Sequence, residues 1–342
     1  MRRITLLAAL AVALLAALPT TASAQTGEQI LPLAGATPIR EHAGYILFSR
    51  WDGAAYRLSV LRDGGVTDLP VRPQAEPFDA DVGPDSGGAP SAVVSLCDAS
   101  CDLYVVGFGA GDVPRPVRNA NTGRDETDPS VWKGRLVFAR HYGDDVVPYT
   151  KPLAAPRSRP SDRLASLPER RCGAVDPPDC RVIEKPDLVA MELWGSRIAQ
   201  SWTYQPDDFP GFRQNEVRLT NVKRTDTRQV ATMVTGLGGQ AYVGPSFSGG
   251  RLGFFRACQG DPAGCSTDGS GAFRYRISDE SYELAGANEA WSAWALTGDG
   301  DLHVPSAFDC SGGDPGSPPS EACGIYRRGA LDWQDVPAER VR

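Results

Sequence analysis

The sequence predicts an all-β protein, a six-bladed β-propeller of four-stranded antiparallel blades. Three observations lead to this prediction. The 342 residues include 37 glycines and 28 prolines without a collagen-like period, as expected for a chain with many turns. No long helical pattern occurs. A short motif recurs six times at spacings of 44 to 62 residues, and each spacing holds four short strands with their turns.

The repeat is clearest in residues 128–140 and 244–256, which share seven of thirteen positions without a gap. Weaker copies occur at residues 44–50, 91–95, 194–199 and 300–304. Each copy contains an apolar run, which is typical of an inner strand covered on both faces, and an alternating segment such as residues 216–222 follows it. We expect the second strands of the blades to be centred near Ile46, Val93, Leu136, Ile198, Leu252 and Leu302. Residues 331–336 are expected to form the last strand of the sixth blade.

These segments resemble the repeats of TolB-like (WD-type) propellers, in which a "P-S-W-S-P-D-G-x-x-I-x-F" hairpin precedes "I-Y-V-x-D" and "R-x-L-T". The resemblance covers about residues 36–340 and implies the six-bladed fold. Only about fifteen residues separate Gln25 from the first blade, so we expect no counterpart of the N-terminal domain of TolB or of its partner-binding role. The chain ends after the sixth blade, so we also expect no hydrolase domain of the oligopeptidase kind.

The N-terminus has the features of a secretory signal peptide. Arg2 and Arg3 precede an apolar run over residues 6–18, and the small residues 22–24 form a cleavage site. We therefore expect residues 1–24 to be a signal peptide and residues 25–342 to be one propeller domain, secreted or periplasmic, that begins at Gln25. The apolar run is too short to span a bilayer, and no later segment is long enough. The two arginines leave both the general secretory and the twin-arginine routes open.

The composition indicates which classes of partner the protein can be expected to bind. Without Arg2 and Arg3 the chain keeps 33 basic against 42 acidic residues, so a nucleic-acid partner is not expected. No cofactor or metal motif is present, and His42, His141 and His303 share no ligand-like spacing. We expect a monomer without cofactor or metal that binds a protein or glycan.

The eight cysteines form four close couples, and in an exported chain they are expected to form disulfides. The alternative, a four-thiolate zinc site, would need two short C-x2-C-like knuckles, which are absent. The couples are Cys97/Cys101, Cys172/Cys180, Cys258/Cys265 and Cys310/Cys323. All fall in connections between second and third strands or between blades, which emerge on one face of a propeller. We expect that face to carry the ligand-binding surface.

Aromatic and acidic residues occupy loops expected on the same face, where rings and carboxylates could hold a sugar, a cationic group or a partner protein. The candidate binding residues are Trp51, Asp52, His141, Tyr142, Asp144, Asp145, Trp202, Tyr204, Asp207, Asp208, Phe209 and Phe212. The competing interpretation is that the rings fold back as core and the aspartates shape turns. Arg50, Arg140 and Arg256 end equivalent strands, and we expect each to pair with a carboxylate of the adjacent blade rather than to bind an anion.

No catalytic residue is assigned. Residues 84–88 are similar to a G-D-S-G-G protease motif, but no histidine has a matching context, so they are better explained as the first turn of the second blade. Carboxylates near the starts of first strands (Asp79, Asp81, Asp125, Asp128, Glu192 and Glu289) could face the central channel. The expected function is therefore a binding or scaffold module. The alternative is a carbohydrate- or ester-active hydrolase, which converging channel carboxylates with a raised pKa would favour.

Overall fold

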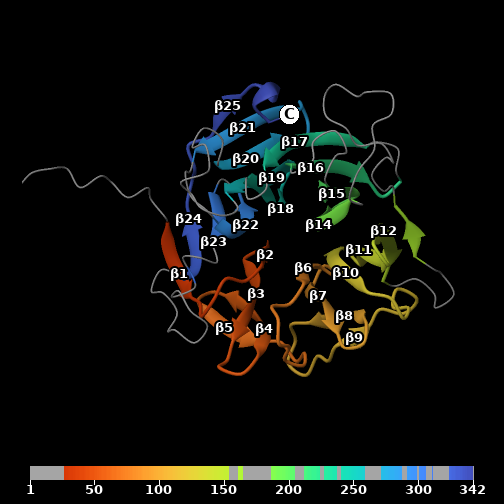
Figure 1. The fold of residues 1–342 in the computed structure, drawn as a ribbon. Coiled ribbons are helices and arrows are strands. Elements are labelled where there is room, and N and C mark those ends of the chain that lie inside the picture. Colours follow the sequence, from red (N-terminus) through yellow and green to blue (C-terminus); the bar gives the residue numbers. More distant parts are fainter. Residues whose placement is uncertain are drawn as a thin grey trace, which may run out of the picture.

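The computed structural model describes most of the chain. The described residues are 27–153, 161–164, 186–204, 212–223, 227–236, 240–258, 271–286, 291–298, 300–305, 310 and 323–341. They form six antiparallel sheets arranged around a central axis, as Figure 1 shows. The predicted six-bladed propeller is confirmed.

Each blade runs outward from the axis through its strands in chain order. The first strands are β2 (Ile39–His42), β6 (Ala80–Pro84), β10 (Glu126–Trp132), β14 (Asp187–Trp194), β18 (Gln240–Ser248) and β22 (Trp291–Thr297). The second strands are β3 (Tyr45–Trp51), β7 (Pro90–Cys97), β11 (Arg135–Tyr142), β15 (Arg197–Tyr204), β19 (Arg251–Cys258) and β23 (Gly300–Pro305). All six predicted strand centres lie within these second strands.

The third strands are β4 (Tyr56–Arg62), β8 (Cys101–Gly107), β12 (Asp145–Pro152), β16 (Phe212–Asn221), β20 (Gly271–Arg276) and β24 (Gly324–Arg328). The outer strands of the first five blades are β5 (Gly65–Asp68), β9 (Arg115–Pro116), β13 (Asp162–Arg163), β17 (Arg228–Gly236) and β21 (Ser281–Gly286). Residues 84–88 end the first strand of blade two and form the turn to the second, as expected.

The sixth blade is closed by the opposite end of the chain. Its outer strand is β1 (Glu28–Pro32), which pairs antiparallel with β24, so the two ends of the propeller lie side by side in Figure 1. The prediction for residues 331–336 was wrong. That segment contains β25 (Gln334–Val336), which adds a fifth strand to blade five by pairing with β21. A short 3-10 helix, η2 (Ala338–Arg340), follows, and the carbonyl of Val341 then accepts the N–H of Thr232 in blade four.

The hydrophobic core is divided among the blade interfaces, with one buried cluster between each pair of neighbouring blades. Strand β11 shows why the second strands are apolar throughout. Leu136 packs into the cluster shared with blade two, while Val137 packs into the cluster shared with blade four. Because alternate side chains of an inner strand enter different interfaces, neither face of the strand can be polar.

The turns and loops leave the disc on two faces. Connections from second to third strands, and from one blade to the next, lie on one face, which we call the disulfide face. The turns from first to second strands lie on the other, which we call the opposite face. One of these turns joins β10 to β11 through Lys133 and Gly134, whose φ angles of 46° and 73° suit a tight hairpin. No described helix is long and apolar enough to cross a membrane.

Candidate functional site

The innermost strands carry polar side chains that tie each blade to the next. Asp81 accepts the Ser130 hydroxyl at 2.7 Å and the Val131 N–H at 3.0 Å through Oδ2. The Ser130 Oγ in turn accepts the N–H of Leu193 in blade four at 2.8 Å. The same pattern continues with Glu192, whose Oε1 accepts the Phe247 N–H of blade five at 2.8 Å. These hydrogen bonds give Asp81 and Glu192 a structural role.

Burial affects the pKa values of these carboxylates more strongly than their hydrogen bonds do. Burial raises the pKa of Asp79 and of Asp81, and it raises the pKa of Glu192 to about 8. The positive charge of Arg40 opposes the rise at all three. Arg40 reaches them from blade one, and its Nη1 lies beside Gly244 of blade five. Since blades one and five are not neighbours, this guanidinium group extends across the axis.

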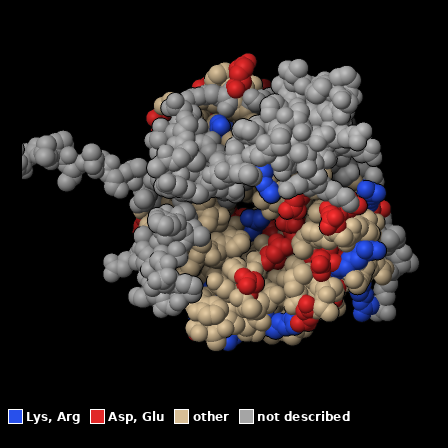
Figure 2. Space-filling model, viewed as in Figure 1, with Lys and Arg blue, Asp and Glu red and all other residues tan. Residues whose placement is uncertain are grey.

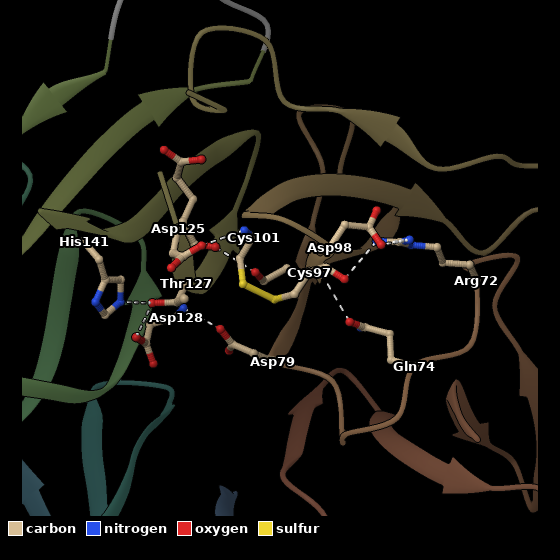
Figure 3. The surroundings of a disulfide bond; sticks show 12 residues. Arg72, Gln74, Asp79, Cys97, Asp98, Cys101, Asp125, Thr127, Asp128 and His141 are labelled. Carbon is tan, nitrogen blue, oxygen red and sulfur yellow. Dashed lines mark hydrogen bonds and ion pairs between the residues drawn. A yellow bond between two sulfur atoms is a disulfide. The ribbon is translucent and has the colours of Figure 1, made fainter. Parts of the chain in front are cut away.

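Two carboxylates form a pair at the disulfide face, where the first strands of blades two and three begin. The Asp128 N–H donates to Asp79 Oδ2 at 2.6 Å, and Asp128 Oδ2 accepts the Thr127 hydroxyl at 3.0 Å. That hydroxyl also lies 2.9 Å from Nε2 of His141, as Figure 3 shows. Burial and then the charge of Asp79 raise the pKa of Asp128 well above its usual value. The mouth of the channel therefore holds a buried acidic pair beside a histidine.

The backbone of Asp128 is unusual. Its φ of 49° lies in the left-handed region, in a bulge between Thr127 and Ser130. The matching residue of blade five is Gly244, with a φ of 37°, in a bulge before Ser246. Glycine adopts this conformation without steric cost, whereas an aspartate is held there by its surroundings. Such strain is common at functional sites.

A space-filling view shows where charged side chains gather on this face. Figure 2 shows acidic side chains gathered around the hollow at the centre of the disc, over blades two and three, with basic side chains next to them. We call the set Arg40, Asp79, Asp81, Asp128 and Glu192 the channel cluster. Within the described ranges, no three His, Cys, Asp or Glu side chains are arranged to hold a metal ion.

Aromatic rings occupy the axis at the opposite face. His42 of blade one contacts Trp132 of blade three with ring centroids 5.1 Å apart. Trp132 contacts Trp194 at 5.6 Å, and Trp194 stacks on Phe247 at 6.2 Å. Because blades one and three are not adjacent, the first contact must cross near the axis. The two ends of the channel thus differ in chemistry, acidic at the disulfide face and aromatic at the other.

A disulfide borders the channel mouth. Cys97 and Cys101 are bonded across the turn from β7 to β8, and the Cys101 N–H donates to Asp125 Oδ1 at 2.9 Å. The Cys97 N–H donates to Gln74 Oε1 at 3.3 Å, and the carbonyl of Cys97 accepts from Arg72 (Figure 3).

A second disulfide joins Cys310 to Cys323 between β23 and β24. Both bonds were predicted, and both lie on the disulfide face. Cys172, Cys180 and Cys265 lie outside the described residues, as does the side chain of Cys258, so the other two predicted couples stay predictions.

The predicted binding residues in blade one remain on the surface. Trp51 is 39% exposed, and its ring lies 5.0 Å from that of Tyr56. Asp52 shapes the loop, since its Oδ1 accepts the N–H groups of Ala54 and Ala55 at 3.0 Å. These hydrogen bonds lower the pKa of Asp52 to about 2. Trp51 is therefore the exposed apolar group of this loop, and Asp52 is its permanent charge.

In blade three, His141 and Tyr142 end β11. The Tyr142 hydroxyl lies 2.7 Å from that of Tyr149, and the guanidinium of Arg124 lies 4.4 Å from the Tyr142 ring. Asp144 and Asp145 follow in the exposed turn to β12.

In blade four, the structure places Trp202 and Tyr204 in strand β15, each 1% exposed, so they are core residues with no free surface. The Tyr204 hydroxyl donates to Glu216 at 2.8 Å. Asp207, Asp208 and Phe209 lie outside the described residues, as does the side chain of Phe212.

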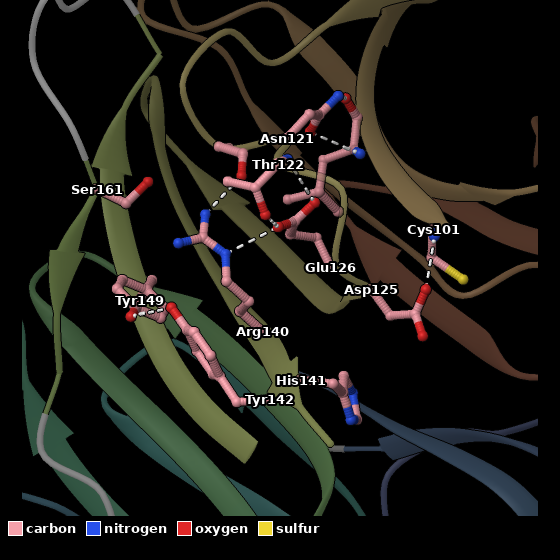
Figure 4. Close-up of polar contacts among 12 residues, drawn as sticks. Cys101, Asn121, Thr122, Asp125, Glu126, Arg140, His141, Tyr142, Tyr149 and Ser161 are labelled. Atoms are coloured by element: carbon pink, nitrogen blue, oxygen red, sulfur yellow. Dashed lines mark hydrogen bonds and ion pairs between the residues drawn. The ribbon is translucent and has the colours of Figure 1, made fainter. Parts of the chain in front are cut away.

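Within the described ranges, two of the three equivalent arginines pair with a carboxylate of their own blade instead of the adjacent blade. Arg140 pairs with Glu126 of its own blade, Nε to Oε1 at 2.8 Å, in the polar network of Figure 4. Arg50 pairs with Asp68 of its own blade at 2.5 Å. Arg256 places Nε 2.9 Å from the Met233 sulfur of blade four. The side chains of Arg50 and Arg140 run along their own sheets, where the fourth and the first strand respectively supply the carboxylate.

The sequence did not single out Arg40 and Thr127. Arg40 could have been found by aligning the first strands, because in the strand register it is equivalent to Asp81, Ser130 and Glu192. Glu289, the remaining strand-start carboxylate, lies outside the described residues.

No known family model matches the chain, and no curated protein matches its sequence. Solved structures with a similar fold include TolB from Acinetobacter baumannii, with 12% identity and a TM-score of 0.46 over 85% of this chain and 66% of that chain. The six-bladed fungal lectin of Aleuria aurantia, which recognises fucose, has 10% identity and a TM-score of 0.44 over 86% of this chain and 94% of that chain. The WD40 domain of coronin from Toxoplasma gondii has 9% identity and a TM-score of 0.43 over 82% of each chain.

At these identities the likeness concerns the fold alone. The chain spans just under two thirds of the TolB chain.

Proposed function

We propose that this protein is an exported binding module that recognises a cationic group at the acidic mouth of its channel. The observation that carries the proposal is the channel cluster, in which four carboxylates from blades two, three and four face the single guanidinium of Arg40. Burial raises their pKa values, and the positive charge of Arg40 offsets this rise only in part. A ligand ammonium or guanidinium would supply the missing charge in a setting where water screens it poorly.

The rim of the site gives the ligand further contacts. Trp51 and Asp52 in blade one, and His141, Tyr142, Asp144 and Asp145 in blade three, lie on the same face as the acidic mouth. An exposed ring can cover the apolar stem that carries a cation, as on a lysine or arginine side chain of a protein or on an amino sugar of a glycan. The disulfide Cys97–Cys101 fixes the loop beside the mouth, so less loop freedom is lost on binding.

The proposal includes export. The two disulfides fit an oxidising compartment outside the cytoplasm. We infer that residues 1–24 are removed as a signal peptide and that residues 25–342 act as one monomeric propeller.

The test is a calorimetric titration with two ligands of the same shape, arginine amide and citrulline amide, which differ in the charge of the side-chain head. We expect arginine amide to bind more tightly, and the double variant D79N/D128N to weaken its binding about tenfold or more, as for the loss of charged hydrogen bonds. The control D63N/E280Q removes two exposed carboxylates of the opposite face with the same change of net charge and should bind as the unmodified protein does. Equal loss in both double variants, or no preference for arginine amide, would contradict the proposal.

The channel cluster also supports a second candidate, a carbohydrate or ester hydrolase, because Asp128, whose pKa is raised well above its usual value, could donate a proton next to the second carboxyl group of Asp79. We place it second, since Asp81 and Glu192 are already occupied by hydrogen bonds to the next blade. Turnover of nitrophenyl glycosides or esters that disappears in D128N would favour the hydrolase over the binding module.

A further inference from the structure

A cavity of about 480 Å³ opens between blades two and three, within the size range of small-molecule sites. It lies on the opposite face, away from the channel cluster. The turns from the first to the second strand of the two blades form part of its wall, with Ser86 on one side and Gly134 on the other. A Cβ at Gly134 would lie 2.8 Å from that of Ser86, so the two turns pack directly against each other and hold this wall in place.

Three cationic side chains line the cavity. Lys151 is only 3% exposed and sits in the wall, on strand β12. Arg115 and Arg118 are exposed and come from the outer part of blade two. Neither arginine forms an ion pair within the part of the chain that the structure describes. Their guanidinium groups can therefore turn toward a ligand without breaking an existing contact.

The one acidic residue of the wall is already engaged. Asp85 Oδ1 accepts the N–H groups of Gly87 at 2.8 Å and Ala89 at 2.9 Å, so this oxygen stabilises its own turn. The two exposed arginines therefore present two guanidinium groups to the cavity. Two such groups match a dianion better than a single carboxylate.

The rest of the wall is apolar. Val105 and Val117 are buried in the cluster between blades two and three, and Leu153 packs against the same cluster. Together with Pro116 they give the cavity a hydrocarbon side next to its cationic side. Such a wall suits a ligand whose anionic head is attached to a ring or an aliphatic body.

We propose that this cavity is a second binding site, for a small molecule that carries a phosphate monoester or two carboxylates on an apolar body. The arginines supply paired donors that match phosphate or carboxylate oxygens, and Lys151 supplies a fixed charge at the wall. The site does not depend on the channel cluster, because it lies on the other face and takes a ligand of opposite charge.

The test is a titration with phenyl phosphate, inorganic phosphate and phenylsuccinate. We expect both aromatic dianions to bind more tightly than inorganic phosphate, and the order of the two shows whether phosphate or dicarboxylate is the preferred head. The variant R115Q/R118Q should weaken phenyl phosphate about tenfold or more, and raised salt should weaken it in the unmodified protein. Both arginines are exposed, so this variant should fold; K151M is the second variant.

Two controls make the result specific. R197Q removes an arginine from another cavity on the same face, lined by Arg197, Arg251 and Arg276, and should leave phenyl phosphate binding unchanged. D128N should also leave it unchanged, which separates this site from the proposed cation site. Binding that R197Q weakens and R115Q/R118Q does not, or binding no tighter than that of inorganic phosphate, would overturn the proposal.

Discussion

Glu192 shows how a single residue can serve both the fold and the site. Its Oε1 accepts the Phe247 N–H at 2.8 Å, which ties blade four to blade five. Burial, with the negative charge of Asp81, raises the pKa of Glu192 to about 8. Burial is the larger of these two causes, and the positive charge of Arg40 opposes both without cancelling them.

The sign of the resulting pH dependence follows from linkage. The unfolded chain releases the Glu192 proton near its ordinary pKa of 4.5, while the folded chain keeps it up to about 8, so this group lowers stability as pH rises between those values. E192Q keeps an oxygen acceptor for the Phe247 N–H and has no proton to lose. We expect the melting temperature of E192Q to fall less between pH 5 and pH 8 than that of the unmodified protein. Parallel melting curves for the two proteins would show that the carboxyl is not held protonated.

At the scale of elements, the second strands were predictable and the edge strands were not. The run Leu136 to Ala139 is fully buried because it faces two neighbouring blades, and such a run is visible in any sequence. Strands β1 and β25 carry no comparable pattern. β1 pairs with a strand about 300 residues away, Gln29 opposite Tyr326, and nothing local specifies that partner.

The candidate site was predictable to a similar degree. The carboxylates were identified by their position before the apolar runs, and Asp79, Asp81, Asp128 and Glu192 lie at the channel. Their convergence with Arg40 depends on the closure of the disc, which no local pattern shows. Trp202 and Tyr204 follow the apolar start of their second strand and were expected in the loop after it. Strand β15 continues through both residues, so they lie in the core.

Blade three contains a buried ion pair that offers a test at this scale. Arg140 is 8% and Glu126 0% exposed, and Thr122 donates a further hydrogen bond to Glu126. We expect R140M to lower the free energy of unfolding by about 3–5 kcal/mol, because it leaves a buried carboxylate unpaired. The double variant R140M/E126Q should recover at least half of that loss in urea unfolding. A double variant as unstable as R140M would mean that packing, and not charge, holds this blade.

The whole molecule depends on the closure of blade six by the N-terminal strand. Leu33, just after β1, is 7% exposed in the cluster between blades six and one, and its N–H donates to the carbonyl of Cys323 at 3.0 Å. The closure thus joins residues from both ends of the chain near the disulfide Cys310–Cys323.

We expect L33A to lower the free energy of unfolding by about 2–4 kcal/mol, as for other buried leucines. The control V66A changes a residue of an outer strand that is 40% exposed and should cost less than about 0.5 kcal/mol. Denaturant unfolding of the two variants measures the difference. Equal stability of L33A and V66A would mean that the propeller holds its shape without this closure.

The central claim is that the channel cluster binds a cation because its own charges are uncompensated. Calorimetric titration of arginine amide in buffers with different ionisation enthalpies measures it directly, as the number of protons exchanged on binding. A bound cation lowers the raised pKa values, so at pH 7 we expect protons to be released, and release should be smaller in E192Q. Binding without proton release, or with proton uptake, would contradict the claim.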